Sequence, residues 1–327
     1  MTKTNENYLN RLETLNFSGN VINDECINNF IFIIKNLVSL RKCAIAQTQM
    51  TKKGLIKVCD ILKTQVNKYW YFEPNGGWFT LINKFDNEEK IFDKKNKLNE
   101  MPVTFGNINI NYLRRNRKKL EDKIYFDFSN CKIKNKNIIS SFEKELVNFP
   151  NIRIINFSFI YNINLPGYEA LSAGLKKLPN LSKLIISSSN ITDKAFEYIC
   201  SIFEKCKKLE YIDMSINNIT NLGFSNFSSC LSKNEIKLKE IDFYCNKIGN
   251  DGFKTFCEES KNNTFINLQK LNLSKNTLGN ESMRDFSMFY AKFESLIEVD
   301  FSHNNLGDEI ILNFTPIIIN ELEIGRA

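Results

Sequence analysis

The sequence predicts an α/β solenoid, in which a short strand and a helix alternate along the whole chain. Two observations predict this fold. An eleven-residue pattern recurs with apolar residues at fixed positions and an asparagine near its end. The residues between copies have the i, i+3, i+4 apolar spacing of amphipathic helices. The four clearest copies begin at Leu209, Leu238, Leu268 and Leu296.

The asparagine position recurs with a nearly constant period. From Cys131 onward the period is 28 to 30 residues, and Thr48 follows Asn20 by 28 residues. From position 48 to position 131 the interval is 83 residues, so two degenerate repeats fit into it, with strands expected near 70–72 and 103–110. The chain then has about 10–11 repeats. The nine marked positions are Asn20, Thr48, Cys131, Ile160, Ser189, Asn217, Asn246, Asn276 and Asn304.

Each part of the repeat has a physical reason. Apolar and polar residues alternate in the strand, so one face of a parallel sheet points inward and the other outward. The asparagine can bond backbone groups where the chain leaves the strand, whereas Ile160 cannot and marks an irregularity. Phe196, Ile199, Cys200 and Phe203 form one helical stripe, which we expect to pack inward.

Repeats of this length with a helix in each resemble the ribonuclease-inhibitor-like subclass of leucine-rich repeat proteins. The resemblance extends from Leu12 to about Thr315. It implies a horseshoe with a parallel β-sheet on the concave side and α-helices on the convex side, and a concave face that holds another macromolecule. We expect residues 1–327 to form a single leucine-rich-repeat domain, with an irregular, degenerate region at about 67–123.

The irregular region allows two interpretations. It holds both tryptophans, Trp70 and Trp78, among other aromatic residues, together with a mixed-charge run over 84–97. Insertions in solenoids often form binding loops. The same aromatic side chains could instead fill the core of two degenerate repeats.

A candidate partner-binding surface lies on the solvent side of the expected sheet. Small polar residues usually occupy these positions, but several copies carry large apolar or aromatic residues there. Exposed patches of this kind often mark binding surfaces, and tyrosine is a favoured interface anchor. The alternative is that neighbouring side chains cover some of them. The candidate concave-face residues are Ile154, Phe159, Ile185, Tyr211, Ile216, Tyr244 and His303.

A second candidate is a cluster of basic residues in the irregular region. The net charge of the chain is +7, and most lysines are spread over helices and loops. The cluster could bind an acidic partner, or it could simply be the solvated end of a helix. A nucleic-acid partner would require a broader basic stripe with exposed aromatic residues, so we expect a protein partner instead. The cluster consists of Arg114, Arg115, Arg117, Lys118 and Lys119.

The sequence favours a protein that is not an enzyme and binds no cofactor. His303 is the one histidine, and there is no glycine-rich phosphate loop and no zinc-ligand spacing. Asp127, Asp213, Asp242 and Asp300 recur at one strand position. Paired carboxylates can perform acid–base chemistry, but this position belongs to the ordinary repeat pattern, so we expect a structural role.

Cysteine usage and apolar runs indicate the compartment. The chain has nine cysteines and no C-x-x-C pair, and Cys26, Cys200 and Cys257 lie in expected helix stripes. This pattern favours buried thiols in a reducing, cytoplasmic environment. No apolar run is long enough to span a membrane, and no targeting segment precedes the first repeat.

Three functions fit these features. The first is a non-enzymatic scaffold that binds a protein partner on its concave face. The second is a structural subunit of a larger complex, cytoskeletal, ciliary or ribonucleoprotein, with contacts on helices and on the two ends of the array. The third is a regulator of a small GTPase, because the Ran GTPase-activating protein shares this repeat subclass. That family carries an acidic C-terminal tail, which this chain lacks.

Overall fold

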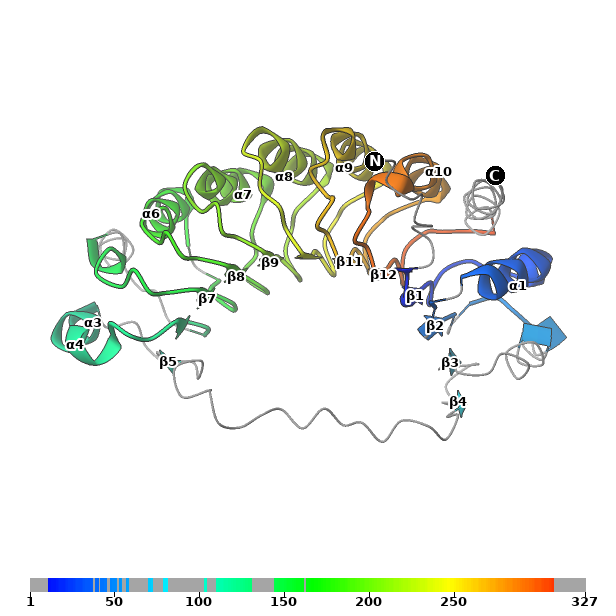
Figure 1. The fold of residues 1–327 in the computed structure, drawn as a ribbon, viewed down its shortest axis with the longest axis horizontal. Helices are drawn as coiled ribbons and strands as arrows, with labels where there is room; N and C mark the ends of the chain where they lie inside the picture. Colours follow the sequence, from blue (N-terminus) through cyan, green and yellow to red (C-terminus); the bar gives the residue numbers. More distant parts are fainter. Residues whose placement is uncertain are drawn as a thin grey trace, which may run out of the picture. The chain divides into compact units, whose positions relative to one another are not determined.

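The computed structural model describes residues 11–37, 39–40, 42–45, 48–51, 53–54, 57–58, 70–72, 79–81, 103–104, 110–130, 144–161 and 163–308. The chain forms two compact units. Unit 1 combines Met1–Glu89 with Ile248–Ala327, and unit 2 is Lys90–Lys247. In each unit, short strands alternate with helices that lie on one side of the sheet (Figure 1).

The described residues of unit 2 form six parallel strands in the order β10-β9-β8-β7-β6-β5. The strands are β5 (Val103–Thr104), β6 (Tyr125–Asp127), β7 (Ile154–Asn156), β8 (Lys183–Ile185), β9 (Tyr211–Asp213) and β10 (Glu240–Asp242). The helices are α3 (Ile110–Arg115), α4 (Arg117–Leu120), α6 (Leu165–Leu175), α7 (Asp193–Cys200) and α8 (Asn221–Lys233).

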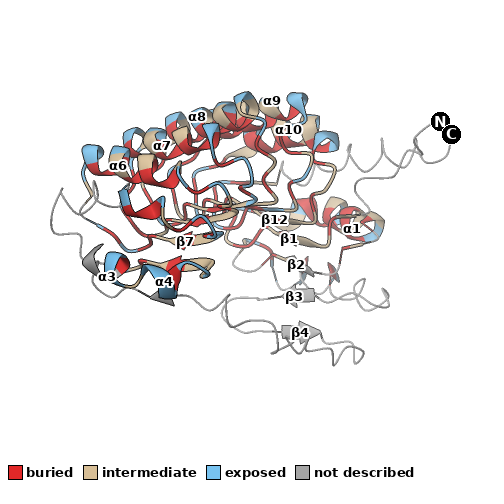
Figure 2. Ribbon diagram, turned by 60° about the vertical axis from the view of Figure 1, so that its left-hand side comes forward, coloured by how far each residue is buried: buried red, intermediate tan, exposed pale blue. Residues whose placement is uncertain are grey.

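The core of unit 2 lies between these strands and helices (Figure 2). The central residue of each strand from β6 to β10 faces inward and is almost fully buried, as the alternation predicts. Phe196 of α7, Phe227 of α8 and Phe243, which follows β10, pack together with ring centroids 5.1 to 5.6 Å apart. Successive repeats therefore share one continuous apolar interior.

In the described part of unit 1 there are also six strands, in the order β4-β3-β2-β1-β12-β11. The strands are β1 (Thr14–Asn16), β2 (Lys42–Ala44), β3 (Trp70–Phe72), β4 (Phe79–Leu81), β11 (Lys270–Asn272) and β12 (Glu298–Asp300). The helices are α1 (Ile27–Asn36), α9 (Asn250–Glu259) and α10 (Asn280–Phe289). Short 3₁₀ turns at Asp24–Cys26, Ser201–Glu204, Ser260–Asn262 and Tyr290–Lys292 adjoin α1, α7, α9 and α10.

The degenerate region contains strands at both predicted places, β3 and β5. The expectation of an entirely parallel sheet is wrong at one point, because β3 and β4 form an antiparallel pair. These two strands are only six residues apart in sequence, a separation that suits a hairpin and is too short for a crossover helix. Most of 67–109 lies outside the described residues, as do Cys59 and Cys131.

The order of the strands differs from the order of the sequence. Stacking in sequence order would place the first and the last repeat at the two ends of the array, but β1 pairs with β12. The pairing is parallel, and Leu15 lies opposite Val299, which lies opposite Leu271 on its other side. The first repeat therefore occupies the place of the next repeat after β12. We call the junction of β1 and β12, with the loops that follow each strand, the seam.

Asparagine contacts at the seam match those between consecutive repeats. Asn20 Oδ1 accepts hydrogen bonds from the backbone N–H groups of Asn304 and Leu306, at 3.2 and 3.1 Å. Asn20 Nδ2 donates to the Phe301 carbonyl at 3.1 Å. In unit 2, Asn217 makes the same three contacts with the preceding repeat. The seam thus satisfies the same buried backbone groups.

A second set of hydrogen bonds crosses the seam at the start of the helices. Asp308 Oδ1 accepts a hydrogen bond from the Asn23 N–H at 2.7 Å. Asp193 Oδ1 accepts from the Thr220 N–H at 2.8 Å in the same way. The seam therefore reproduces the strand, asparagine and helix-start contacts of two consecutive repeats, although no short loop joins β12 to β1.

Gly19 offers a test of the seam. Its backbone has a φ of +67°, and a Cβ atom built there would lie 2.2 Å from Nδ1 of His303. We expect Gly19→Ala to destabilise the protein by about 1–3 kcal/mol, because it adds a clash to a left-handed backbone. Urea unfolding of Gly19→Ala, His303→Ala and the double variant measures the coupling. If the losses in free energy of unfolding of the two single variants simply add in the double variant, residues 19 and 303 are not in contact.

Candidate functional site

The candidate site is the surface of unit 2 on the side of its strands opposite the helices; we call it the sheet face. Six of the seven predicted concave-face residues belong to unit 2. Phe159 and Ile216 are exposed, with exposed fractions of 43% and 46%. The other four, which are half-buried, are Ile154, Ile185, Tyr211 and Tyr244.

The first residues of the neighbouring strands β7, β8 and β9 do not form a continuous apolar strip. Strand register places Lys183 between Ile154 and Tyr211. The Lys183 ammonium lies 3.6 Å from the centroid of the Tyr211 ring, a cation–π contact that sequence reasoning missed. Burial raises the pKa of Tyr211 and the Asp213 carboxylate adds to the effect, so the hydroxyl stays protonated and can donate a hydrogen bond.

The aspartate column has the structural role that we expected. The Oδ1 atoms of Asp127, Asp213 and Asp242 each accept a hydrogen bond from the backbone N–H two residues later, at 2.8 to 2.9 Å. Asn156 makes the same contact at 2.9 Å. These side chains hold the turn that leaves each strand.

The exposed apolar residues occupy a position with a special backbone. The loops that follow β6, β7, β8, β9 and β10 each contain, at the corresponding position, one residue with a φ of +53° to +61°; in the loop after β8, Asn190 also has a positive φ. The N–H groups of four of these residues donate to a carbonyl of the next repeat; for Phe159 the acceptor is Ser187, and for Ile216 it is Tyr244. A left-handed backbone is unfavourable for bulky residues and for β-branched ones above all. The residues at this position are Asn130, Phe159, Ser188, Ile216 and Cys245.

His303 occupies the same position in unit 1. It is exposed, has a φ of +54°, and its N–H donates to the Ser18 carbonyl at 2.6 Å. Its ring lies against Gly19. His303 therefore contacts the first repeat across the seam, and its role in partner binding stays a prediction.

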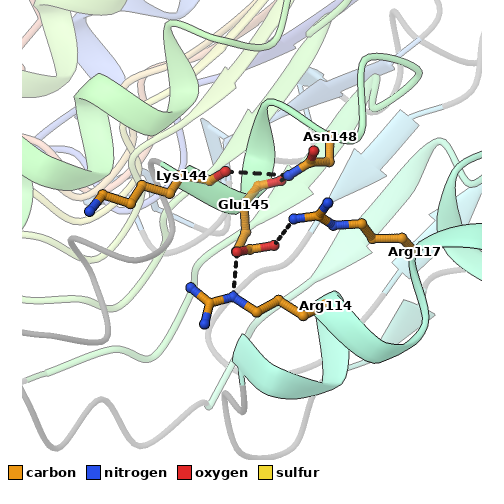
Figure 3. A network of polar contacts seen from close by, with 5 residues as sticks. All are labelled: Arg114, Arg117, Lys144, Glu145 and Asn148. Atoms are coloured by element: carbon orange, nitrogen blue, oxygen red, sulfur yellow. Dashed lines mark hydrogen bonds and ion pairs between the residues drawn. The ribbon is translucent and has the colours of Figure 1, made fainter.

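The basic cluster divides into two parts. Arg114 and Arg117 both bind the buried carboxylate of Glu145, at 2.5 and 3.0 Å (Figure 3). Arg115, Lys118 and Lys119 are exposed. Two of the five cations thus tie α3 and α4 to the next repeat, and this contact joins residues that are 31 and 28 positions apart in the sequence.

Glu145 should make stability depend on pH. Burial raises its pKa, but the hydrogen bonds from Arg114 and Arg117 outweigh this effect, so its pKa is below the usual value. A lowered pKa adds stability above the unfolded-state pKa, about 4.3, and this stability is lost as the pH falls through the folded-state pKa.

We therefore expect Glu145→Gln to lower the free energy of unfolding by about 1–3 kcal/mol at neutral pH, because two arginines lose a charged partner. The difference from the parent should shrink as the pH falls below 4. Urea unfolding from pH 7 to pH 3 measures it, with the exposed Glu121→Gln as control. A difference independent of pH would contradict this role.

A pair of cysteines lies on the helix side of unit 2. The Cys200 thiol donates a hydrogen bond to the Cys230 sulfur. This bond lowers the pKa of Cys230 to about 7, against the opposing effect of burial and with help from Lys233. Burial raises the pKa of Cys200. Cys230 is thus the more reactive thiol of the pair.

The described residues offer neither a metal site nor a membrane-spanning helix. Within the described ranges, no group of three or more histidine, cysteine, aspartate and glutamate side chains is placed to hold a metal ion. No helix in the described part of the chain is long and apolar enough to cross a membrane.

Comparisons with known proteins place the repeats in a family. The family model described as "Leucine Rich repeat" matches residues 266–287 and 294–314. The human protein "NACHT, LRR and PYD domains-containing protein 12" is 26% identical over 141 residues, which cover 43% of this chain and 13% of that protein. The chain therefore matches a small part of the length of this relative.

Solved structures are also similar. An internalin of Listeria monocytogenes is 18% identical with a TM-score of 0.38, and the match covers 94% of this chain and 78% of that one. A protein of Bacteroides fragilis is 12% identical with a TM-score of 0.41, covering 65% of this chain and 69% of that one. The two matched segments and the stacked strand–helix units show that this chain contains leucine-rich repeats, and the length and helices of these repeats are similar to those of the ribonuclease-inhibitor-like type.

Proposed function

We propose that this protein is a non-enzymatic scaffold that binds a protein partner through the sheet face of unit 2. One observation carries the proposal: Phe159 and Ile216 expose large apolar side chains from left-handed backbone positions. Such positions favour asparagine or glycine, so the two residues reduce stability and also leave apolar surface in water. Both costs are offset when a partner covers the side chains.

The surroundings of these residues suit a protein partner. Ser188 lies between Phe159 and Ile216 in the stack of repeats and is buried, so a small polar residue separates the two apolar side chains. With strands about 4.8 Å apart, two repeats separate the side chains by about 10 Å. Tyr211, Lys183 and Asp213 supply hydrogen-bonding groups on the same face. Apolar anchors within a polar rim are typical of protein interfaces.

Ile216→Asn separates binding from stability. We expect it to raise the free energy of unfolding by about 1 kcal/mol, because asparagine tolerates a left-handed backbone. The hydrogen bond from the backbone N–H of residue 216 does not depend on the side chain, so it is kept. We expect the same change to reduce affinity for the partner by tenfold or more, since it removes an anchor. Denaturant unfolding and an affinity pull-down with mass spectrometry measure the two effects.

The matched control is Leu222→Asn. Leu222 lies on α8 and is 63% exposed, so it is an equally accessible apolar residue away from the sheet face. The proposal requires a partner that parent and Leu222→Asn chains capture and that Ile216→Asn and Phe159→Asn chains lose. A partner lost from the Leu222 variant alone would instead favour a structural subunit that is contacted through its helices.

The described cysteines support an intracellular location for this function. Cys26, Cys200, Cys206 and Cys257 are free and buried. Thiols of this kind are typical of proteins that stay in a reducing compartment.

A further inference from the structure

The seam brings together two complementary surfaces of one chain. One surface belongs to the first repeat and presents β1, Asn20 and Asn23. The other belongs to the last described repeat and presents β12, Asn304 and Asp308. The strand, asparagine and helix-start contacts between them are those of consecutive repeats.

An open seam would leave costly unsatisfied groups on both surfaces. The N–H groups of Phe301 and His303 donate to the carbonyls of Asn16 and Ser18, at 3.0 and 2.6 Å. The buried N–H groups of Asn304 and Leu306 bond to Asn20. Without the first repeat, β12 would be an edge strand with one side unpaired, and the apolar interior beside it would be exposed. Such an edge is a template for another strand of matching pattern.

We propose that the seam also closes between two copies of this chain, with the first repeat of each copy stacked on β12 of the other. A second copy is the occupant that fits, because it presents the same asparagines and strand at the same spacing as the first repeat in cis. The exchange forms no new kind of contact. It replaces the two intramolecular junctions of two monomers with two intermolecular ones, related by a two-fold axis.

The balance between the two forms depends on concentration. The first repeat of the same chain has a high effective concentration at β12, so the closed monomer is favoured in dilute solution. High protein concentration and mild denaturant favour the exchanged dimer, because denaturant opens the seam and concentration supplies the second copy. This inference is independent of the proposed partner on the sheet face of unit 2, which the exchange leaves unchanged.

Cysteines at paired positions across the seam can trap the exchange. Val21 and Gly307 lie opposite each other in a parallel bridge. Val21 is 51% exposed, and a Cβ at Gly307 would approach other atoms no closer than 3.4 Å. Val21→Cys and Gly307→Cys chains, each carrying one of the substitutions, are mixed at high concentration in mild urea, diluted and oxidised with diamide. Mass spectrometry then identifies peptides that join position 21 of one chain to position 307 of the other.

We expect this mixed dimer at a yield at least tenfold above that of a control mixture of Val21→Cys with Val147→Cys, whose exposed residue lies in unit 2. Adding Asn20→Leu to the Val21→Cys chain should reduce the yield, because it removes the asparagine contacts. A chain with both cysteines shows that the pair can be bridged. If that chain forms the bridge within itself while the mixture stays at the control level, exchange does not occur. If neither forms it, the seam itself is wrong and the proposal falls with it.

Discussion

Asn217→Leu should lower the free energy of unfolding by about 3–5 kcal/mol. The Asn217 side chain is 8% exposed, and its Oδ1 accepts hydrogen bonds from the N–H groups of Ser189 and Ile191 at 3.1 and 2.9 Å. Its Nδ2 donates to the carbonyls of Ile186, Met214 and Ser215. Leucine has a similar volume but leaves these backbone groups unsatisfied, at about 1–3 kcal/mol for each group that water cannot reach.

Asn217→Ser is the matched control. Serine already occupies this position in the preceding repeat, where Ser189 Oγ bonds the Phe157 and Ser187 carbonyls and accepts from the Ile160 N–H. We therefore expect Asn217→Ser to cost less than half as much as Asn217→Leu. Urea unfolding measures both. A leucine variant as stable as the parent would show that the asparagine hydrogen bonds between repeats contribute little to the stability of the array.

Phe227→Ala should cost about 3–5 kcal/mol, the usual range for removing a buried phenylalanine ring. The Phe227 side chain is fully buried on α8, and its ring contacts those of Phe196, Phe203 and Phe243 at centroid distances of 5.6, 5.8 and 5.1 Å. These rings come from α7, the 3₁₀ turn after it, and the segment after β10. A cavity at Phe227 therefore weakens three successive repeats together.

Phe227→Leu keeps most of the volume and should cost about 1 kcal/mol. Thermal and urea unfolding of the two variants separate lost volume from lost ring contacts. In a repeat array whose interfaces are coupled, the alanine variant should also broaden the transition, because stability is a sum over neighbouring repeats. A loss below 1 kcal/mol for Phe227→Ala would contradict the packing described here.

The repeat pattern was sufficient to predict the strands of the clear repeats and the face that their residues occupy. Leu184, Ile212 and Ile241 lie in register in the sheet interior, as their alternation with polar neighbours predicts. Cys200 and Cys257 are buried on helix stripes, as predicted. These features depend on local spacing, which a single repeat already specifies.

The neighbour of each repeat could not be predicted in the same way. Asn20 and Asn304 carry the same pattern as every other repeat, so any two stacking surfaces are compatible in sequence. Continuity along the chain then suggests sequential order, and β1 on β12 departs from it. Non-local contacts such as Lys183 with Tyr211 and Glu145 with Arg114 need strand register, which the sequence indicates only indirectly. The left-handed backbone of Ile216 was also missed, because a β-branched residue disfavours it.

The candidate site was predicted in part. The positions of Phe159 and Ile216 on the solvent side of the sheet follow from the strand period, and the structure shows that both are exposed. Their proposed role as anchors depends on a partner and stays a prediction. Arg114 and Arg117 were grouped with a binding surface by charge alone, whereas the structure shows them bound to Glu145.

Methyl NOE spectroscopy tests the order of the strands most directly. In deuterated protein with labelled leucine and valine methyl groups, facing residues on neighbouring parallel strands are close enough to give strong cross-peaks. We predict cross-peaks from Val299 to both Leu15 and Leu271 in dilute solution, since all three residues lie side by side. Cross-peaks from Val299 to Leu271 with none to Leu15 would show that the first repeat does not follow the last, and would contradict this account.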